Sequence, residues 1–419
     1  MLIFPVITIL ISALLTRKVT GSWLSPGSFF AISWSFFLIV PILFAPEYEV
    51  DQMGVWFITI LTMACAAGSV IAYKPSPPKH RVSVLSLNTY YRNLHRPLVL
   101  FTIISIGGLI FLFSHALNTY NFGYYSMGWV SIPNLIAVDR YSGYINYPFI
   151  IKYSLYCIYP ANLLGGLLLS VRQISFKMKA LTVVPLLLAL ILGIIEGART
   201  SILLGLVLFF SAWMSGAMIN GSRYEKKKPY LKLALGSGAI LIGFTSVFVL
   251  IQWLRQGMDS IIVDLLIDRI RAYFFGYLAA FTQWVGEYES VHLSGVLTTF
   301  AGPFNLIGVM ERSLGFYEPV NISSGISTNI FTALRGLVID FSIPGAIIIT
   351  FIMGFFLQLS YQRGISGSII NTLPISMFYA FTLYSPLISI FHYNSILFSW
   401  VIIAVIFLFQ HKSNHVLGK

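Results

Sequence analysis

The chain has 419 residues, of which 57% are hydrophobic and 10% are charged, and its mean hydropathy is +0.83. Soluble domains carry about 25% charged residues, so this composition excludes a soluble globular protein and predicts an all-α polytopic membrane protein. The net charge of +12 does not predict a nucleic-acid partner, because the cations cluster in short loops that would face an anionic membrane surface. Cys65 and Cys157 lie inside apolar runs, so neither a disulfide nor a metal site is expected.

A helix needs about 20 apolar residues to cross the hydrocarbon core of a bilayer. On this basis the apolar runs predict eleven spans within a single membrane domain, residues 1–419. In chain order the expected spans are Leu2–Leu15, Gly27–Phe44, Met53–Tyr73, Pro97–Ala116, Pro148–Ser170, Leu181–Ile195, Ser201–Ile219, Leu231–Ile251, Leu337–Leu359, Gly367–Tyr384 and Asn394–Phe409. Phe274–Trp284 is also apolar, but its 11 residues are too few to cross, so we expect a re-entrant or interfacial helix there.

The distribution of charge between the loops predicts the orientation in the membrane. Thirteen of the fourteen acidic residues fall on one side of the threaded chain, and 18 of the 26 Lys and Arg fall on the other. Because cytoplasmic loops are enriched in cations, the N-terminus is expected outside and the C-terminus inside. Eight cations remain outside, and seven of them are Arg, the side chain that binds phosphate in a bidentate fork. The sequence therefore predicts an outward-facing site for an anionic, phosphorylated substrate.

Two outward loops are long enough to carry such a site. The first, residues 118–147, is rich in aromatic residues, and the second, residues 252–336, is the longest hydrophilic stretch of the chain. Helical periodicity over Ile261–Ala280 places Asp264, Asp268 and Arg271 on one face, which also fits a surface helix stabilised by carboxylate–Arg pairs. The arginines of the second loop are Arg255, Arg269, Arg271, Arg312 and Arg335.

Two further cations lie near the outer ends of spans. Arg199 ends the motif Glu196-Gly-Ala-Arg199, where Glu196 is expected to orient or neutralise it. The alternative is that both side chains only extend toward lipid headgroups. Arg140 and Tyr141 lie in the aromatic loop, which serves either as an interfacial belt or as a platform on which sugar rings stack.

The second loop also contains the candidate general bases. His292 is its only histidine and lies within five residues of Glu287, so either side chain is a candidate to accept a proton from a substrate hydroxyl. The sequence contains no DxD, HExxH, GxxxxGK[ST] or GxSxG motif. We therefore expect no metal, no cofactor and no nucleotide substrate. An outward-facing enzyme would instead need a donor that arrives activated and anchored to lipid.

Three short motifs give the chain a resemblance to a known family. They are Glu196-Gly-Ala-Arg199-Thr-Ser, Arg269-Ile-Arg271-Ala-Tyr-Phe with Ala280-Phe, and Asp340-Phe-Ser-Ile-Pro-Gly345, each at or near the start of an apolar helix. In these motifs and in its layout, the chain resembles the Wzy-type O-antigen polymerases, also called oligosaccharide repeat-unit polymerases.

The resemblance implies a GT-C-like membrane glycosyltransferase fold and metal-independent transfer of a glycan from undecaprenyl diphosphate onto the next lipid-linked repeat unit. It implies a site at the periplasmic face of the bacterial inner membrane, membrane lipids as surroundings and a chain-length regulator as a possible partner. Arg199, Arg255, Arg269 and Arg271 would bind the diphosphate, and Glu287 or His292 would act catalytically. The expected glycan contacts are Arg140, Tyr141, Glu196 and Arg335. Two alternatives stay open, a lipid-linked oligosaccharide flippase and an O-antigen ligase.

Overall fold

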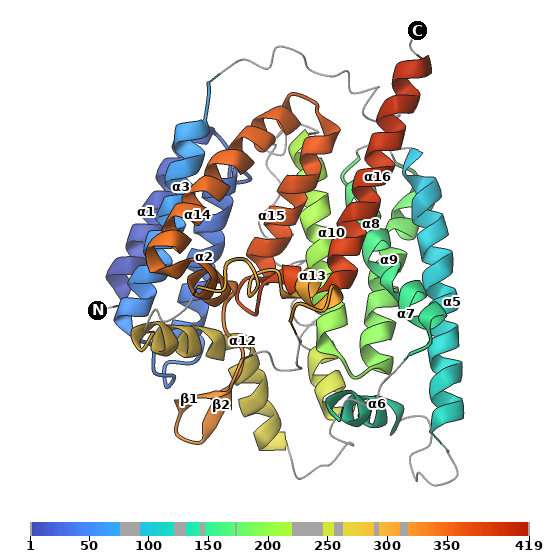
Figure 1. Cartoon of the computed structure of the whole chain (residues 1–419), viewed down its shortest axis with the longest axis horizontal. Helices are drawn as coiled ribbons and strands as arrows, with labels where there is room; N and C mark the ends of the chain where they lie inside the picture. The colour runs from blue at the N-terminus through green and yellow to red at the C-terminus, as the bar shows by residue number, and fades with distance from the viewer. Residues whose placement is uncertain are drawn as a thin grey trace. The chain divides into compact units, whose positions relative to one another are not determined.

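The computed structural model describes residues 2–75, 93–120, 131–142, 147–171, 174–219, 246–254, 263–288, 293–310 and 317–417 (Figure 1). Most of these residues are helical, which confirms the helical class. Seven of the helices in these ranges are long and apolar enough to cross a membrane, and two shorter apolar helices follow near the C-terminus. The protein is therefore a polytopic helical membrane protein. Its chain divides into two compact units, residues 1–84 with 268–419 and residues 85–267.

The first unit is built on the helices α1, α2, α3 and α14. Their bounds are α1 Ile3–Thr20, α2 Pro26–Phe44, α3 Gln52–Ala72 and α14 Ala333–Ile365, and the unit ends with α15 Thr372–Tyr384 and α16 Asn394–Leu417. Small residues allow α3 and α14 to approach closely, since a Cβ added at Gly68 or at Gly354 would lie 2.1 Å from a carbonyl oxygen of the other helix. The hydroxyl of Ser69 donates to the Gly354 carbonyl at 3.2 Å across this contact.

Helix α12, Val263–Gly286, joins the two segments that the sequence suggested separately, and at 24 residues it is longer than either. From Asp268 onward it belongs to the first unit, where Figure 1 shows its later part running crosswise to the long helices. It packs on α2 and on the connection between α2 and α3. The Tyr277 hydroxyl donates to the Phe37 carbonyl within α2 at 2.5 Å, and the Gln283 amide donates to the Glu49 carbonyl in the connection at 2.9 Å. The long loop of residues 252–336 is thus anchored through α12 to α2 and to the α2–α3 connection.

The same loop contains a feature that an all-α prediction misses. Strands β1, Val320–Ser323, and β2, Ile326–Thr328, form an antiparallel hairpin in which Val320 pairs with Thr328. Gly325 has a φ of 79° at the turn, a conformation that favours glycine. The hairpin packs with α12 and the α2–α3 connection around Tyr48, Ala280 and Ile322. This small core holds the loop in a defined structure.

Helix α14 begins earlier than the sequence predicts and is kinked near its start. The expected span began at Leu337, whereas the helix begins at Ala333, so Arg335 lies in its first turn rather than in a loop. Ser342 has non-helical angles, φ 64° and ψ 173°, and Pro344 follows it. Proline cannot donate a helical hydrogen bond, which favours a break at this point. A short first helical segment, residues 333–341, therefore precedes the longer apolar part.

The second unit contains α5 to α10. Their bounds are α5 His95–Thr119, α6 Ile132–Tyr141, α7 Phe149–Tyr156, α8 Ile158–Leu169, α9 Phe176–Ile195 and α10 Arg199–Ile219. The expected span Pro148–Ser170 is divided at Cys157 into α7 and α8. Most of the expected span Leu231–Ile251 lies outside the described residues. Part of the aromatic loop forms α6, which packs on α5 and α9 through Ile132 and Ile136.

Candidate functional site

Arg335 lies in the first turn of α14 among three aromatic rings. Its guanidinium carbon is 4.0 Å from the ring centre of Phe331, 4.1 Å from that of Tyr317 and 4.6 Å from that of Trp284. Phe331 comes just before α14, Tyr317 just before β1, and Trp284 from α12. Ring faces attract a cation electrostatically, so these three contacts fix the position of the guanidinium.

The rings stabilise the charge of Arg335 but leave hydrogen-bond donors without acceptors. Its Nε and Nη1 atoms are buried, and within the described part of the chain neither makes a hydrogen bond. A buried donor that lacks an acceptor costs about 1–3 kcal/mol, and more when the group is charged. An arginine in this setting is therefore poised to bind an acceptor other than the described residues, for which an anion is the best match.

Two buried hydroxyls, those of Thr332 and Thr299, lie at or beside the same turn. Thr332 is the N-cap residue of α14, yet its side chain makes no cap hydrogen bond, and its Oγ1 atom is buried without a partner among the described residues. Thr332 and Arg335 are three residues apart and so share one face of the helix. The Oγ1 of Thr299 is also buried without a described partner, and it lies 3.4 Å from where a Cβ of Gly336 would stand. The backbone N–H groups of Ala333 and Arg335 already donate to the carbonyls of Ser385 and Thr332, at 2.7 Å and 3.0 Å. The side-chain donors available to an anion are therefore the two hydroxyls and the guanidinium.

Tyrosines complete the surroundings of this donor cluster, which comprises Thr299, Thr332 and Arg335. Tyr48 packs in one core with Tyr317 and Phe331, and its hydroxyl is buried without a partner in the described ranges. Burial raises the pKa of both Tyr48 and Tyr317 above the ordinary tyrosine value. Both phenols therefore stay neutral, and neither adds a negative charge that would repel an anionic ligand.

Asp340 holds the cluster in place. Its carboxylate accepts hydrogen bonds from the Thr299 backbone N–H at 2.7 Å, the Thr298 backbone N–H at 2.9 Å and the Ser294 hydroxyl at 2.5 Å. The Ser389 hydroxyl donates to the Thr299 carbonyl at 2.8 Å. Thr299 is therefore fixed from two sides, and the Asp340 carboxylate, already accepting three hydrogen bonds, serves as a positioning group.

The second unit contains a separate charged cluster. Arg140 on α6 pairs with Glu196 at the end of α9 at 3.2 Å, with side chains 25% and 13% exposed. Burial alone would lower the pKa of Arg140, but the nearby Glu196 carboxylate and Tyr147 raise it above its ordinary value overall. The Arg199 guanidinium carbon lies 4.8 Å from the ring centre of Phe248. The sequence assigned Glu196 to Arg199, whereas the ion pair seen for Glu196 joins it to Arg140.

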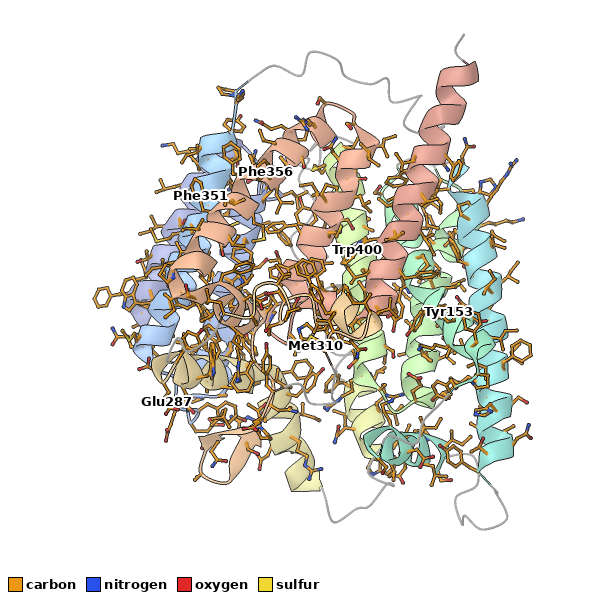
Figure 2. The ribbon with its side chains drawn as sticks, viewed as in Figure 1. Tyr153, Glu287, Met310, Phe351, Phe356 and Trp400 are labelled. Carbon is orange, nitrogen blue, oxygen red and sulfur yellow. The ribbon has the colours of Figure 1, made fainter. Side chains whose placement is uncertain are left out.

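The remaining expected site residues of the first unit lie on or beside α12. Arg271 pairs with Glu47 at 2.6 Å and donates to the Phe44 carbonyl at 2.9 Å, so it fastens α12 to the α2–α3 connection. Arg269 is exposed on α12, and Glu287 is exposed just after its end, at the edge shown in Figure 2. Tyr141 ends α6 in the second unit. Arg255, His292 and Arg312 lie outside the described residues.

Among the expected site residues, the structure brings together Arg140 and Glu196, and it gives Arg335 a set of neighbours that the sequence did not suggest. Trp284, Tyr317 and Phe331 come from separate parts of the loop and meet in the small core that the hairpin and α12 form. The one signal in the sequence was an isolated Arg335 beside an apolar run. No group of His, Cys, Asp or Glu suited to hold a metal occurs among the described residues.

The class of protein follows from these observations: a polytopic helical membrane protein with a buried donor cluster at the start of a spanning helix. No family model, curated protein or solved structure matches the chain. The resemblance to the Wzy-type polymerases therefore rests on the short motifs and the layout of the sequence.

Proposed function

We propose that the protein is a glycosyltransferase that joins oligosaccharide repeat units carried on a polyprenyl diphosphate into a surface polysaccharide. The proposed location is the periplasmic face of a bacterial inner membrane, with the N-terminus outside, as in the Wzy-type polymerases. The proposal rests mainly on the surroundings of Arg335. Its buried Nε and Nη1 have no acceptor among the described residues, and three aromatic rings surround the guanidinium. A phosphate supplies the missing acceptors, and aromatic faces suit the attached sugar.

The donor cluster matches what this reaction demands. When the glycosidic bond breaks, the electron pair leaves with the lipid diphosphate, and negative charge increases on the phosphate oxygen. Donors fixed before the reaction stabilise that charge most in the transition state, which lowers the barrier. Arg335, Thr332 and Thr299 are such donors, because α14 and Asp340 hold them in place. In this proposal Arg335 binds the diphosphate in addition to, or instead of, contacting the glycan.

The acceptor hydroxyl must lose a proton as it attacks the donor sugar. Glu287 is exposed at the end of α12, the helix that also supplies Trp284, and so remains a candidate base beside His292. In the second unit, Arg140 and Arg199 remain candidates for contacts to the glycan or the diphosphate.

Reconstitution tests the proposal. The purified full-length protein in proteoliposomes would receive polyprenyl-diphosphate-linked repeat units as its only substrate, with excess EDTA present. The proposal predicts a ladder of polymerised product and release of free polyprenyl diphosphate. A ladder that appears only when Mg²⁺ or Mn²⁺ is restored would contradict the metal-independent chemistry. Movement of the substrate across the vesicle membrane without any new glycosidic bond would favour a flippase instead.

A further inference from the structure

The segment 293–310 exposes large apolar side chains although it belongs to the outward loop. Leu306 is 72% exposed, Ile307 68% and Val309 57%, and they stand in α13, Ala301–Leu306, and the residues directly after it. Each exposed apolar side chain forgoes the gain from burial, about 25 cal/mol per Å². Several of them in succession indicate a surface that contacts something apolar.

This apolar segment is fixed against the outer ends of two apolar helices. A Cβ added at Gly302 would lie 2.8 Å from the Phe391 carbonyl oxygen, between α15 and α16. The Phe300 ring stacks on that of Phe391, with ring centres 4.8 Å apart and an angle of 15°. Figure 1 shows α13 beside the start of α16, a helix that itself exposes Val401 and Val405. The exposed surface of α13 thus continues onto a helix whose exposed side chains are apolar.

The other end of the segment belongs to the donor cluster. Thr299 has its hydroxyl beside Gly336 in the first turn of α14, and only six residues lie between it and Leu306. One short segment therefore connects buried donors suited to phosphate with exposed apolar side chains suited to hydrocarbon. A single ligand with a phosphate head and an apolar tail matches both ends.

We propose that residues 300–309 form the contact surface for the isoprenoid tail of the substrate. The phosphate of that lipid binds at Arg335, Thr332 and Thr299, and its tail passes over Leu306, Ile307 and Val309 into the bilayer beside α16. This inference rests on the proposed function, because it takes an isoprenoid lipid as the carrier. It adds the route by which that lipid reaches the donor cluster.

Photolabelling tests the contact without requiring catalysis. The full-length protein in nanodiscs would be irradiated with a long-chain prenyl phosphate that carries a diazirine in its tail, and the labelled peptides would be mapped by mass spectrometry. We expect the label to concentrate on residues 300–309. Arg335→Gln should reduce this labelling about tenfold, the loss expected when a charge-assisted hydrogen bond to phosphate is removed. Arg363→Gln, at the exposed far end of α14, should leave it unchanged.

Two further probes identify the source of the phosphate. The corresponding prenyl alcohol, which lacks phosphate, should label the exposed spans without preference for residues 300–309. Phosphatidic acid with a diazirine in its acyl chain should behave in the same way. Equal labelling of residues 300–309 by phosphatidic acid, or labelling that is insensitive to Arg335→Gln, would overturn the proposal.

The outcome is separable from that of the proposed function. Segment labelling that depends on Arg335, in a protein that forms no polymer, would refute the transferase and leave the lipid contact standing. Polymer formed at the normal rate, with no labelling of residues 300–309, would refute the tail route alone. The double variant Leu306→Ser, Ile307→Ser removes the proposed apolar contact and should lower labelling of residues 300–309. Ile11→Ser, which removes an exposed apolar side chain on α1, is its control and should leave that labelling unchanged.

Discussion

The Asp340 carboxylate accepts a hydrogen bond from the backbone N–H of Thr299 at 2.7 Å, which connects the segment before α13 to the first part of α14. The same carboxylate accepts the Thr298 N–H at 2.9 Å. Because Thr299 also faces Gly336, this contact sets the spacing between the Thr299 hydroxyl and the turn that carries Arg335. The donor cluster therefore depends on one buried aspartate that itself makes no contact with a substrate.

Asp340→Asn should destabilise the protein by about 2 kcal/mol. The amide keeps only one accepting oxygen, and its NH₂ group would face a backbone N–H of Thr298 or Thr299 that has lost its acceptor. A lowered midpoint of thermal unfolding in detergent would record this loss. Ser294→Ala removes one of the three hydrogen bonds to Asp340, together with the contact of the Ser294 hydroxyl to the Thr298 hydroxyl at 2.9 Å, and should cost less, about 1 kcal/mol. An unfolding midpoint for Asp340→Asn equal to that of the wild type would contradict the positioning role.

The close contact between α3 and α14 predicts the effect of added volume. In Gly354→Val the new Cβ would lie 2.1 Å from the Cys65 carbonyl oxygen, so the two helices must separate. Overpacking of this kind typically costs about 1–3 kcal/mol. We expect reduced yield of folded protein on size-exclusion chromatography. Gly107→Val, where nothing lies within 4 Å of the new Cβ, should elute like the wild type.

The ion pair between Arg140 and Glu196 predicts strong coupling in a double-mutant cycle. Arg140→Met and Glu196→Gln each leave a partly buried group without its partner, and breaking a buried pair commonly costs about 3–5 kcal/mol. The double variant should be less destabilised than the sum of the single variants, because no unpaired charge remains. Unfolding midpoints of the four proteins give the coupling. Additive losses would show that the pair is too solvated to matter.

The orientation of α14 can be tested with two engineered cysteines. Ser324 is exposed at the turn of the β hairpin and Ser366 is exposed just after the other end of α14, so one span separates them. The charge distribution predicts that Ser324→Cys reacts with an impermeant maleimide from outside and Ser366→Cys only from inside. Cys65 and Cys157 are buried and should give little background. The reverse pattern would place the donor cluster in the cytoplasm.

The sequence was sufficient to predict the membrane class and most span positions, because runs of apolar residues report directly on burial in lipid. It predicted α2 to within one residue, whereas it missed the break at Cys157, which lies in an uninterrupted apolar run. The β hairpin was missed because its two strands are only four and three residues long. Short strands leave too little alternation to be recognised.

The candidate site was predicted only in part, for a physical reason. The side of the membrane on which each arginine is expected singled out Arg335, but only as a glycan contact. It favoured Arg271 for the diphosphate, whereas Arg271 forms an ion pair with Glu47. Two features set Arg335 apart: its Nε and Nη1 are buried without an acceptor among the described residues, and aromatic rings from positions 284, 317 and 331 surround it. Contacts between residues so far apart in sequence have no local signature.

The central claim, that Arg335 stabilises the leaving diphosphate, is tested most directly by the rate of a single glycan transfer. Arg335→Lys keeps the charge but loses the directed N–H pair, so the rate should fall by about 10²–10³ at matched protein levels. Arg363→Lys, exposed at the opposite end of the same helix, should transfer at the wild-type rate. Transfer by Arg335→Lys at the wild-type rate would contradict the claim.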